Sequence, residues 1–213
     1  WPLCYSPDLP YYRWNFNTTT PLDTPPQAHV CDDPTRGPAN TSRWNTGLTY
    51  SPRITAPDVW YSYQDNNPTT PLGTPCLANY DGSGGTCPQL FPELGTGGVG
   101  PHGADVYEFD PDEPNPTKFP PYYDGAVFLG EFTRDYLREV RLDDAGAVVK
   151  INNVLNCGAV GGNPTPERPF ECDNPMDLQF GEDGTFYLLT YGDGFFAANA
   201  DAGMYRFEYV KGL

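Results

Sequence analysis

The second half of the chain alternates apolar and polar side chains, and this pattern constrains the fold most strongly. Alternation with a period of two is typical of β-strands, whose successive side chains point to opposite faces of a sheet. We predict strands at 105–110, 126–133, 136–144, 147–152, 176–181, 185–192 and 203–210. Asp144-Ala145-Gly146 and Asp183-Gly184 indicate tight turns, because glycine tolerates the positive φ that short hairpins require. We therefore predict that these strands form an antiparallel meander.

The first half, residues 1–104, is rich in Pro, Thr, Asn, Gly and aromatic residues, with only short apolar islands. The 213 residues include 25 Pro and 23 Gly, and 15% of them are aromatic. This combination favours many turns around an aromatic core, because disordered chains lack large apolar side chains. We therefore expect one all-β unit over residues 1–213, loop-rich over 1–104 and built of regular strands over 105–213.

The six cysteines are even in number and form no C-x-x-C pair, which favours disulfides over zinc. Proximity along the chain predicts the pairs Cys4 with Cys31, Cys76 with Cys87, and Cys157 with Cys172. Asn17 and Asn40 each begin an N-glycosylation acceptor pattern. No apolar run reaches membrane-spanning length. These features predict a secreted, extracellular glycoprotein with no membrane partner.

A formal charge of −16, with only 12 Lys and Arg, argues against nucleic acid or an anionic membrane as a partner. Acidic loops instead suit calcium, which prefers several oxygen ligands. The first candidate metal loop contains Asp110, Asp112 and Glu113, and the second contains Asp193, Asn199 and Asp201. Phe195 and Phe196 in the second loop could stack on a sugar. The alternative for both loops is an acidic turn that simply remains solvated.

The sequence contains a weak internal repeat. Each copy begins with an Asp-Gly pair and continues with an apolar strand, a polar loop and an amphipathic strand. The two pairs, Asp124-Gly125 and Asp183-Gly184, lie 59 residues apart. A propeller blade uses four short antiparallel strands in about 40–50 residues, so this spacing fits a blade with an insertion. The Cys157–Cys172 pair would hold that insertion. The alternative is two unrelated hairpins in a β-sandwich.

Five segments carry a family resemblance: WPLCYSPDLPY at 1–11, LFPELGTGG at 90–98, VYEFDPDEPNPTKFPPYYDG at 106–125, EFTRDYLREV at 131–140, and NPMDLQFGEDGTFYLLTYGDGFFAANADAGMYRFEYV at 174–210. Together they resemble the C-terminal half of bacterial glucose/sorbosone dehydrogenases. Those proteins are secreted six-bladed β-propellers, and several use pyrroloquinoline quinone (PQQ) and calcium to oxidise sugars. The resemblance implies a partial six-bladed propeller of about three blades with long disulfide-clamped loops.

The same resemblance implies a function for the chain. It would be the C-terminal portion of a quinone-type sugar oxidoreductase, inactive alone, with the catalytic histidine on an N-terminal half that precedes Trp1. A partial ring exposes apolar blade faces, so the remaining half or another chain is the expected partner, with a sugar as substrate. The alternative is a non-catalytic extracellular fragment that binds carbohydrate or serves in a surface assembly.

Arg134 resembles a family position that offers a cation to the quinone carboxylates, and the alternative is a surface arginine paired with Asp135 or Glu139. Asn174 and Met176 stand where quinone-using relatives carry arginines. Neither side chain can neutralise an anionic cofactor.

For the remaining candidate residues we expect structural rather than catalytic roles. We expect Met176 to pack inside a blade and Asp177 to accept a hydrogen bond from the backbone of a neighbouring blade. His102 lies in a glycine-rich segment where a histidine could act as a general base, but a solvated side chain is the expectation there and at His29.

Overall fold

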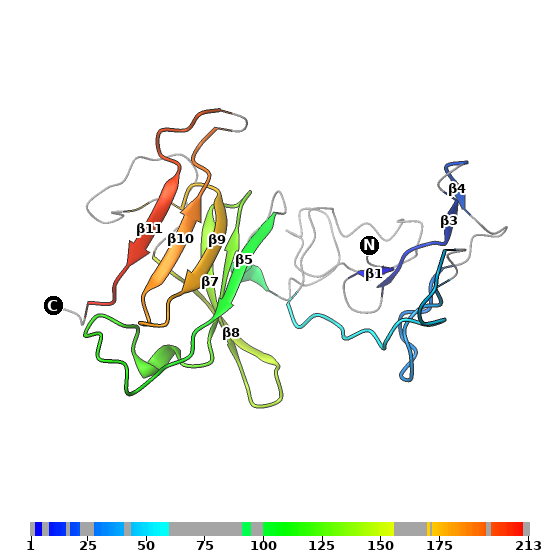
Figure 1. Cartoon of the computed structure of the whole chain (residues 1–213), viewed down its shortest axis with the longest axis horizontal. Helices are drawn as coiled ribbons and strands as arrows, with labels where there is room; N and C mark the ends of the chain where they lie inside the picture. The colour runs from blue at the N-terminus through cyan, green and yellow to red at the C-terminus, as the bar shows by residue number, and fades with distance from the viewer. Residues whose placement is uncertain are drawn as a thin grey trace.

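The computed structural model describes residues 3–5, 9–15, 18–21, 28–40, 44–59, 91–94, 100–155, 170, 172–194 and 197–210. Over these ranges the chain is all-β, with one four-stranded and one three-stranded antiparallel sheet and no α-helix. Figure 1 shows the strands of both sheets gathered in one body, with β1, β3 and β4 to one side. The predicted fold class is confirmed at this level.

The four-stranded sheet is a meander of consecutive strands. Its strands are β5 (Pro101–Val106), β6 (Val127–Glu131), β7 (Tyr136–Leu142) and β8 (Val148–Asn153). The turn between β7 and β8 is the one predicted from Asp144-Ala145-Gly146. Gly146 has a φ of 84°, and Asp143 Oδ1 accepts hydrogen bonds of 2.9 Å from the backbone N–H groups of Ala145 and Ala147.

The three-stranded sheet is a second meander, in the order β11-β10-β9. Its strands are β9 (Pro175–Phe180), β10 (Phe186–Thr190) and β11 (Gly203–Phe207). The predicted turn at Asp183-Gly184 joins β9 to β10. Gly184 has a φ of 71°, and Asp183 Oδ1 accepts a 3.0 Å hydrogen bond from the Thr185 N–H.

Six of the seven predicted strands coincide with observed strands, but the bounds predicted for the first were wrong. We predicted 105–110, whereas β5 spans Pro101–Val106. Proline and glycine at 101 and 103 obscure the alternation, yet both fit their places. Pro101 begins an edge strand, where a missing donor costs little, and Gly103 lies in the register shift between His102 and Ala104.

The two sheets touch through the first strand of each meander. Asp105 Oδ2 on β5 accepts a 2.7 Å hydrogen bond from the Phe180 N–H on β9. At Gly103 the backbones are so close that a Cβ atom would lie 2.7 Å from the Leu178 nitrogen. Large side chains separate the sheets beyond this contact, so the main core lies between the later strands.

That core is aromatic. Phe119 packs against six other rings, and its nearest centroid, that of Phe180, is 5.2 Å away. The Tyr107 hydroxyl donates to the Phe119 carbonyl, which satisfies its buried polar group. The buried members of this cluster are Tyr107, Phe119, Ala126, Phe128, Leu137, Cys172, Leu178, Phe186 and Leu188.

The outward faces of the two sheets differ. On the four-stranded sheet, Tyr136, Val140 and Ile151 pack with Leu94 from the short 3-10 turn η1 (Pro92–Leu94), and Leu94 is fully buried. The opposite side of the three-stranded sheet presents Leu189 and Met204, which are 43% and 73% exposed. η1 therefore covers the centre of the first face, where Val106 and Leu142 are still 47% and 39% exposed, whereas the second face is open at Leu189 and Met204.

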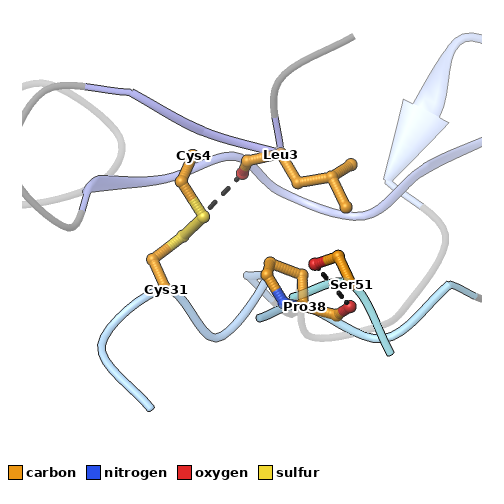
Figure 2. Close-up of a disulfide and its surroundings, with 5 residues drawn as sticks. All are labelled: Leu3, Cys4, Cys31, Pro38 and Ser51. Atoms are coloured by element: carbon orange, nitrogen blue, oxygen red, sulfur yellow. Dashed lines mark hydrogen bonds between the residues drawn. A yellow bond between two sulfur atoms is a disulfide. The ribbon is translucent and has the colours of Figure 1, made fainter. Parts of the chain in front are cut away.

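The N-terminal part contains four strands of two residues each: β1 (Cys4–Tyr5), β2 (Leu9–Pro10), β3 (Trp14–Asn15) and β4 (Thr20–Pro21). Figure 2 shows the Cys4–Cys31 disulfide, with the Cys31 sulfur beside the Leu3 carbonyl. This pairing was predicted. A disulfide closing a loop of this size stabilises the fold by about 3.5 kcal/mol in chain-entropy models.

The other two predicted disulfides involve residues outside the described ranges. Cys172 is disulfide-bonded, but its expected partner Cys157 lies outside the described ranges, as do Cys76 and Cys87. Asn17 also lies outside them, whereas Asn40 is exposed. None of the helices in the described part of the chain has the length and apolar character to cross a membrane.

Candidate metal site

One end of the paired sheets gathers acidic side chains from three segments. These segments are the β6–β7 turn, the residues just before β9, and the β10–β11 loop. Asp173, Asp193 and Asp201 each present a carboxylate oxygen, and these oxygens lie within 4.8 Å of one another. Asp193 is exposed and the other two are half-buried.

The β10–β11 loop is shaped by its own side chains. Asn199 Nδ2 donates 2.8 Å hydrogen bonds to the carbonyls of Tyr191 and Gly194, which folds the loop back on itself. Gly192 has a φ of 84°, and a Cβ there would lie 2.7 Å from an Asp201 carboxylate oxygen. The Asp193 N–H donates a 3.0 Å hydrogen bond to Asp201 Oδ2. These contacts bring Asp193 and Asp201 together.

Asp135 and Asn174 connect the other two segments. Both have a positive φ, of 50° and 51°, which is uncommon outside glycine. Asp135 Oδ1 accepts a 2.9 Å hydrogen bond from the Asn174 N–H, and Asn174 Nδ2 donates 2.6 Å to the Phe132 carbonyl. Burial raises the pKa of Asp135, and the negative charge of Asp193 raises it further, although the hydrogen bond from Asn174 opposes the shift. Negative charge is therefore concentrated here.

The triad has the chemistry of a calcium site. Calcium ligands are oxygens at about 2.3–2.6 Å from the ion, so two ligands of one ion can lie up to about 5 Å apart. The three carboxylates meet this limit. A divalent cation would also relieve the mutual repulsion of these like charges. Among the described residues, this is the one group of three or more Asp, Glu, His or Cys side chains whose possible ligand atoms lie this close together.

The sequence identified two of the three carboxylates. Asp193 and Asp201 were predicted as ligands, whereas Asn199 holds the loop through backbone carbonyls, and Phe195 and Phe196 lie outside the described residues. Asp173 was missed. Its only sequence signal is its place two residues before β9, since the start of that strand lies at the same end of the sheets as the β10–β11 loop.

The other predicted metal loop has an internal cation nearby. The Lys118 ammonium donates hydrogen bonds to the backbone carbonyls of Asp110 and Glu113, the second at 2.6 Å. Asp110 Oδ1 accepts from the Asp112 N–H at 2.8 Å, and Glu113 Oε1 accepts from the Asn115 N–H at 3.0 Å. Calcium binding by Asp110, Asp112 and Glu113 stays a prediction.

The residues expected to meet PQQ do not form a cationic grip for its carboxylates. Arg134 Nη1 donates a 2.7 Å hydrogen bond to the Leu94 carbonyl, on the outward side of the four-stranded sheet. Arg134 also lies near the Tyr136 phenol, whose pKa burial raises to about 12. Asn174, where relatives carry arginine, is engaged with the Phe132 carbonyl. In this arrangement Arg134 and Asn174 do not act as a paired cationic site for PQQ, and PQQ binding stays a prediction.

Four other residues were singled out from the sequence: Met176, Asp177, His102 and His29. Met176 is half-buried, and Asp177 is exposed with its Oδ1 accepting 2.9 Å from the Leu178 N–H of its own strand. Asp105, and not Asp177, makes the carboxylate-to-backbone bond between the sheets. His102 is exposed, with its ring centroid 5.4 Å from that of Phe132. Burial, and then the charge of Arg13, lower the pKa of His29.

Comparisons with known proteins do not identify the chain. No family model matches the sequence, and no curated protein matches it. The family resemblance carried by the segments quoted above therefore stays a prediction.

Proposed function

We propose that the chain is the C-terminal portion of a secreted β-propeller protein of the glucose/sorbosone dehydrogenase type. In this proposal it supplies blades and a calcium site to a sugar oxidoreductase, and it does not carry the catalytic centre. The observation that carries the proposal is the stacking of two successive meanders whose first strands are in backbone contact. Propeller blades are small antiparallel sheets arranged radially around a central axis, which brings their first strands closest together.

The open sheet face supports the partner part of the proposal. Leu189 and Met204 project from the three-stranded sheet on the side away from the core. In a ring of blades, such a face packs against the next blade. We propose that the remaining blades, from the same protein or another chain, cover it.

For Arg134 and Asn174, a structural role is favoured over a catalytic one. Arg134 and Asn174 direct side-chain donors to the Leu94 and Phe132 carbonyls, which fixes the architecture of this end of the sheets. The second candidate function is therefore a non-catalytic extracellular component that binds carbohydrate or joins a surface assembly. Both candidates share the calcium site.

Calcium binding tests the site directly. At calcium concentrations about 100-fold above Kd, we expect the free energy of unfolding to rise by about 2.7 kcal/mol, because calcium binds only the folded triad. Asp201→Asn removes one ligand charge and should abolish most of this gain, as measured by chemical denaturation with and without calcium. The matched control is Asp144→Asn, at an exposed carboxylate in the β7–β8 turn outside both acidic loops. Equal stabilisation of wild type and Asp201→Asn, or its loss in Asp144→Asn, would contradict the assignment.

Dye reduction separates the two candidate functions. Protein isolated from its natural source is supplied with PQQ, calcium and aldoses, and electron transfer to a soluble dye is followed. The oxidoreductase proposal predicts sugar-dependent reduction by that material and none by residues 1–213 alone. Folded natural protein without activity supports the non-catalytic component, whereas activity of residues 1–213 would refute our assignment of the catalytic centre.

A further inference from the structure

A cavity of about 170 Å³ lies in the N-terminal part of the chain, outside the four-stranded and three-stranded sheets. Two isolated antiparallel bridges border it, one between Tyr12 and Ala28 and the other between Ala39 and Tyr50. The segment that follows Ala28 continues to Cys31, which its disulfide fixes (Figure 2). Backbone pairing and a covalent bond therefore hold the walls in place, as in ligand sites that are formed before the ligand arrives.

The cavity is positively charged in a chain whose formal charge is −16. Among the described residues that line it, the charged side chains are Arg13, Arg36 and Asp33, two cations against one anion. His29 also lines the cavity, and burial, followed by the charge of Arg13, lowers the pKa of its imidazole. The imidazole is therefore uncharged at pH 7. These lining residues together leave one excess positive charge.

Arg36 is held in a way that leaves one edge of its guanidinium available. Its Nε donates a 3.0 Å hydrogen bond to Asp33 Oδ2, and its Cζ lies over the Tyr50 ring, 3.9 Å from the centroid. The hydroxyl and N–H of Thr35 donate to Asp33 Oδ1 at 2.7 and 2.9 Å, which fixes that carboxylate. Neither Nη atom of Arg36 has a hydrogen-bond partner among the described residues, and the side chain is 51% exposed. Two parallel Nη donors match the two oxygens of a carboxylate.

We propose that the cavity binds a short aliphatic monocarboxylate. The carboxylate accepts hydrogen bonds from Arg36 Nη1 and Nη2, and the charge of Arg13 attracts it further. The hydrocarbon tail lies against Ala28, Val30 and Ala39, which form an apolar part of the lining. One negative charge balances the one excess positive charge, whereas a phosphate dianion would exceed it.

The size of the cavity separates this site from the function proposed above. It is smaller than the roughly 300–1,000 Å³ of sites for drug-sized ligands, so it suits an acid of a few carbons and not a quinone of several fused rings. The site also uses neither the Asp triad nor the strands of the two larger sheets. It can therefore be present whether or not the chain belongs to an oxidoreductase.

Binding of butyrate tests the proposal. The full protein is titrated at low ionic strength, where charges are least screened, and binding is followed by nuclear magnetic resonance. We expect saturable binding with a Kd of about 1 mM, because a ligand of so few atoms gains little affinity in total. Butyramide has the same shape without the charge, and it should bind at least about tenfold more weakly.

Two matched substitutions locate the binding. Arg36→Gln should weaken butyrate binding at least about tenfold, because charge-assisted hydrogen bonds are lost. Arg53→Gln removes the same charge from an exposed residue that does not line the cavity, so it should bind as wild type does. Equal weakening in the two variants would mean that butyrate responds only to the overall charge, which would overturn the proposal.

A third variant keeps the test decisive if Arg36→Gln alters the fold. Ala39 is half-buried and lines the cavity, so Ala39→Leu should fill it and remove binding from a folded protein. Folding of each variant is checked by near-ultraviolet circular dichroism. The proposal is overturned if wild type does not bind butyrate, if folded Ala39→Leu binds it unchanged, if butyramide binds as tightly as butyrate, or if inorganic phosphate binds and butyrate does not.

Discussion

Replacing Gly103 with alanine should lower the free energy of unfolding by about 3 kcal/mol or more, the sum of backbone strain and overpacking. The new Cβ would lie 2.7 Å from the Leu178 nitrogen and 2.8 Å from the Asp177 Cα, both of them backbone atoms that cannot rotate away. Gly103 also has a φ of 69°, which L-residues adopt at a cost. The sheets would have to separate at their closest contact. Urea unfolding followed by circular dichroism measures the loss.

Gly125→Ala is the matched control. Gly125 has nearly the same backbone conformation, with a φ of 72°, but among the described residues no atom beyond its chain neighbours lies within 4 Å of the position that a Cβ would take. It should therefore lose only the conformational part, about 1–2 kcal/mol. Equal losses in the two variants would show that β5 and β9 do not touch at this point.

Phe186→Ala should lower the free energy of unfolding by about 3–5 kcal/mol, the usual cost of deleting a large buried ring. Phe186 on β10 is fully buried. Its ring centroid is 5.0 Å from that of Phe180 and 5.7 Å from that of Phe128, so the ring bridges the two sheets. Chemical denaturation gives the loss in stability.

Leu189→Ala is the control for the core substitution. Leu189 lies on the same strand but on the opposite face of the sheet, and it is 43% exposed. Its truncation should cost less than about 1 kcal/mol, as surface substitutions do. A loss as large as that of Phe186→Ala would show that this face is buried in residues 1–213 alone, which contradicts the open face described above.

The sequence predicted those strands correctly whose position depends only on which side chains are buried. The alternation in 126–153 and 176–207 is strong because one face of each strand packs into a buried cluster, which is the aromatic core for most strands and the outward cluster around Leu94 for β8. The start of β5 was missed because the reason for its position is not local. Gly103 is required by the backbone of β9, which lies more than 70 residues away in the sequence.

The candidate site was predictable only in part for the same reason. Asp193 and Asp201 lie in one loop, so their proximity could be inferred from the sequence. Asp173 joins them because β9 and β10 pair, which places its segment beside Tyr191 and Gly192 through backbone hydrogen bonds of 3.0 and 3.2 Å. Arg134 shows the converse limit: its residue type suits an anion, but the fold gives it the Leu94 carbonyl.

The difference between the two outward sheet faces gives the pair of sheets a direction. Residues of η1 cover the centre of the four-stranded side, where Val106 and Leu142 stay 47% and 39% exposed, whereas Leu189 and Met204 leave the three-stranded side open. Two copies that meet through their Leu189 and Met204 sides would form a two-fold pair, because each copy presents the same patch to the other.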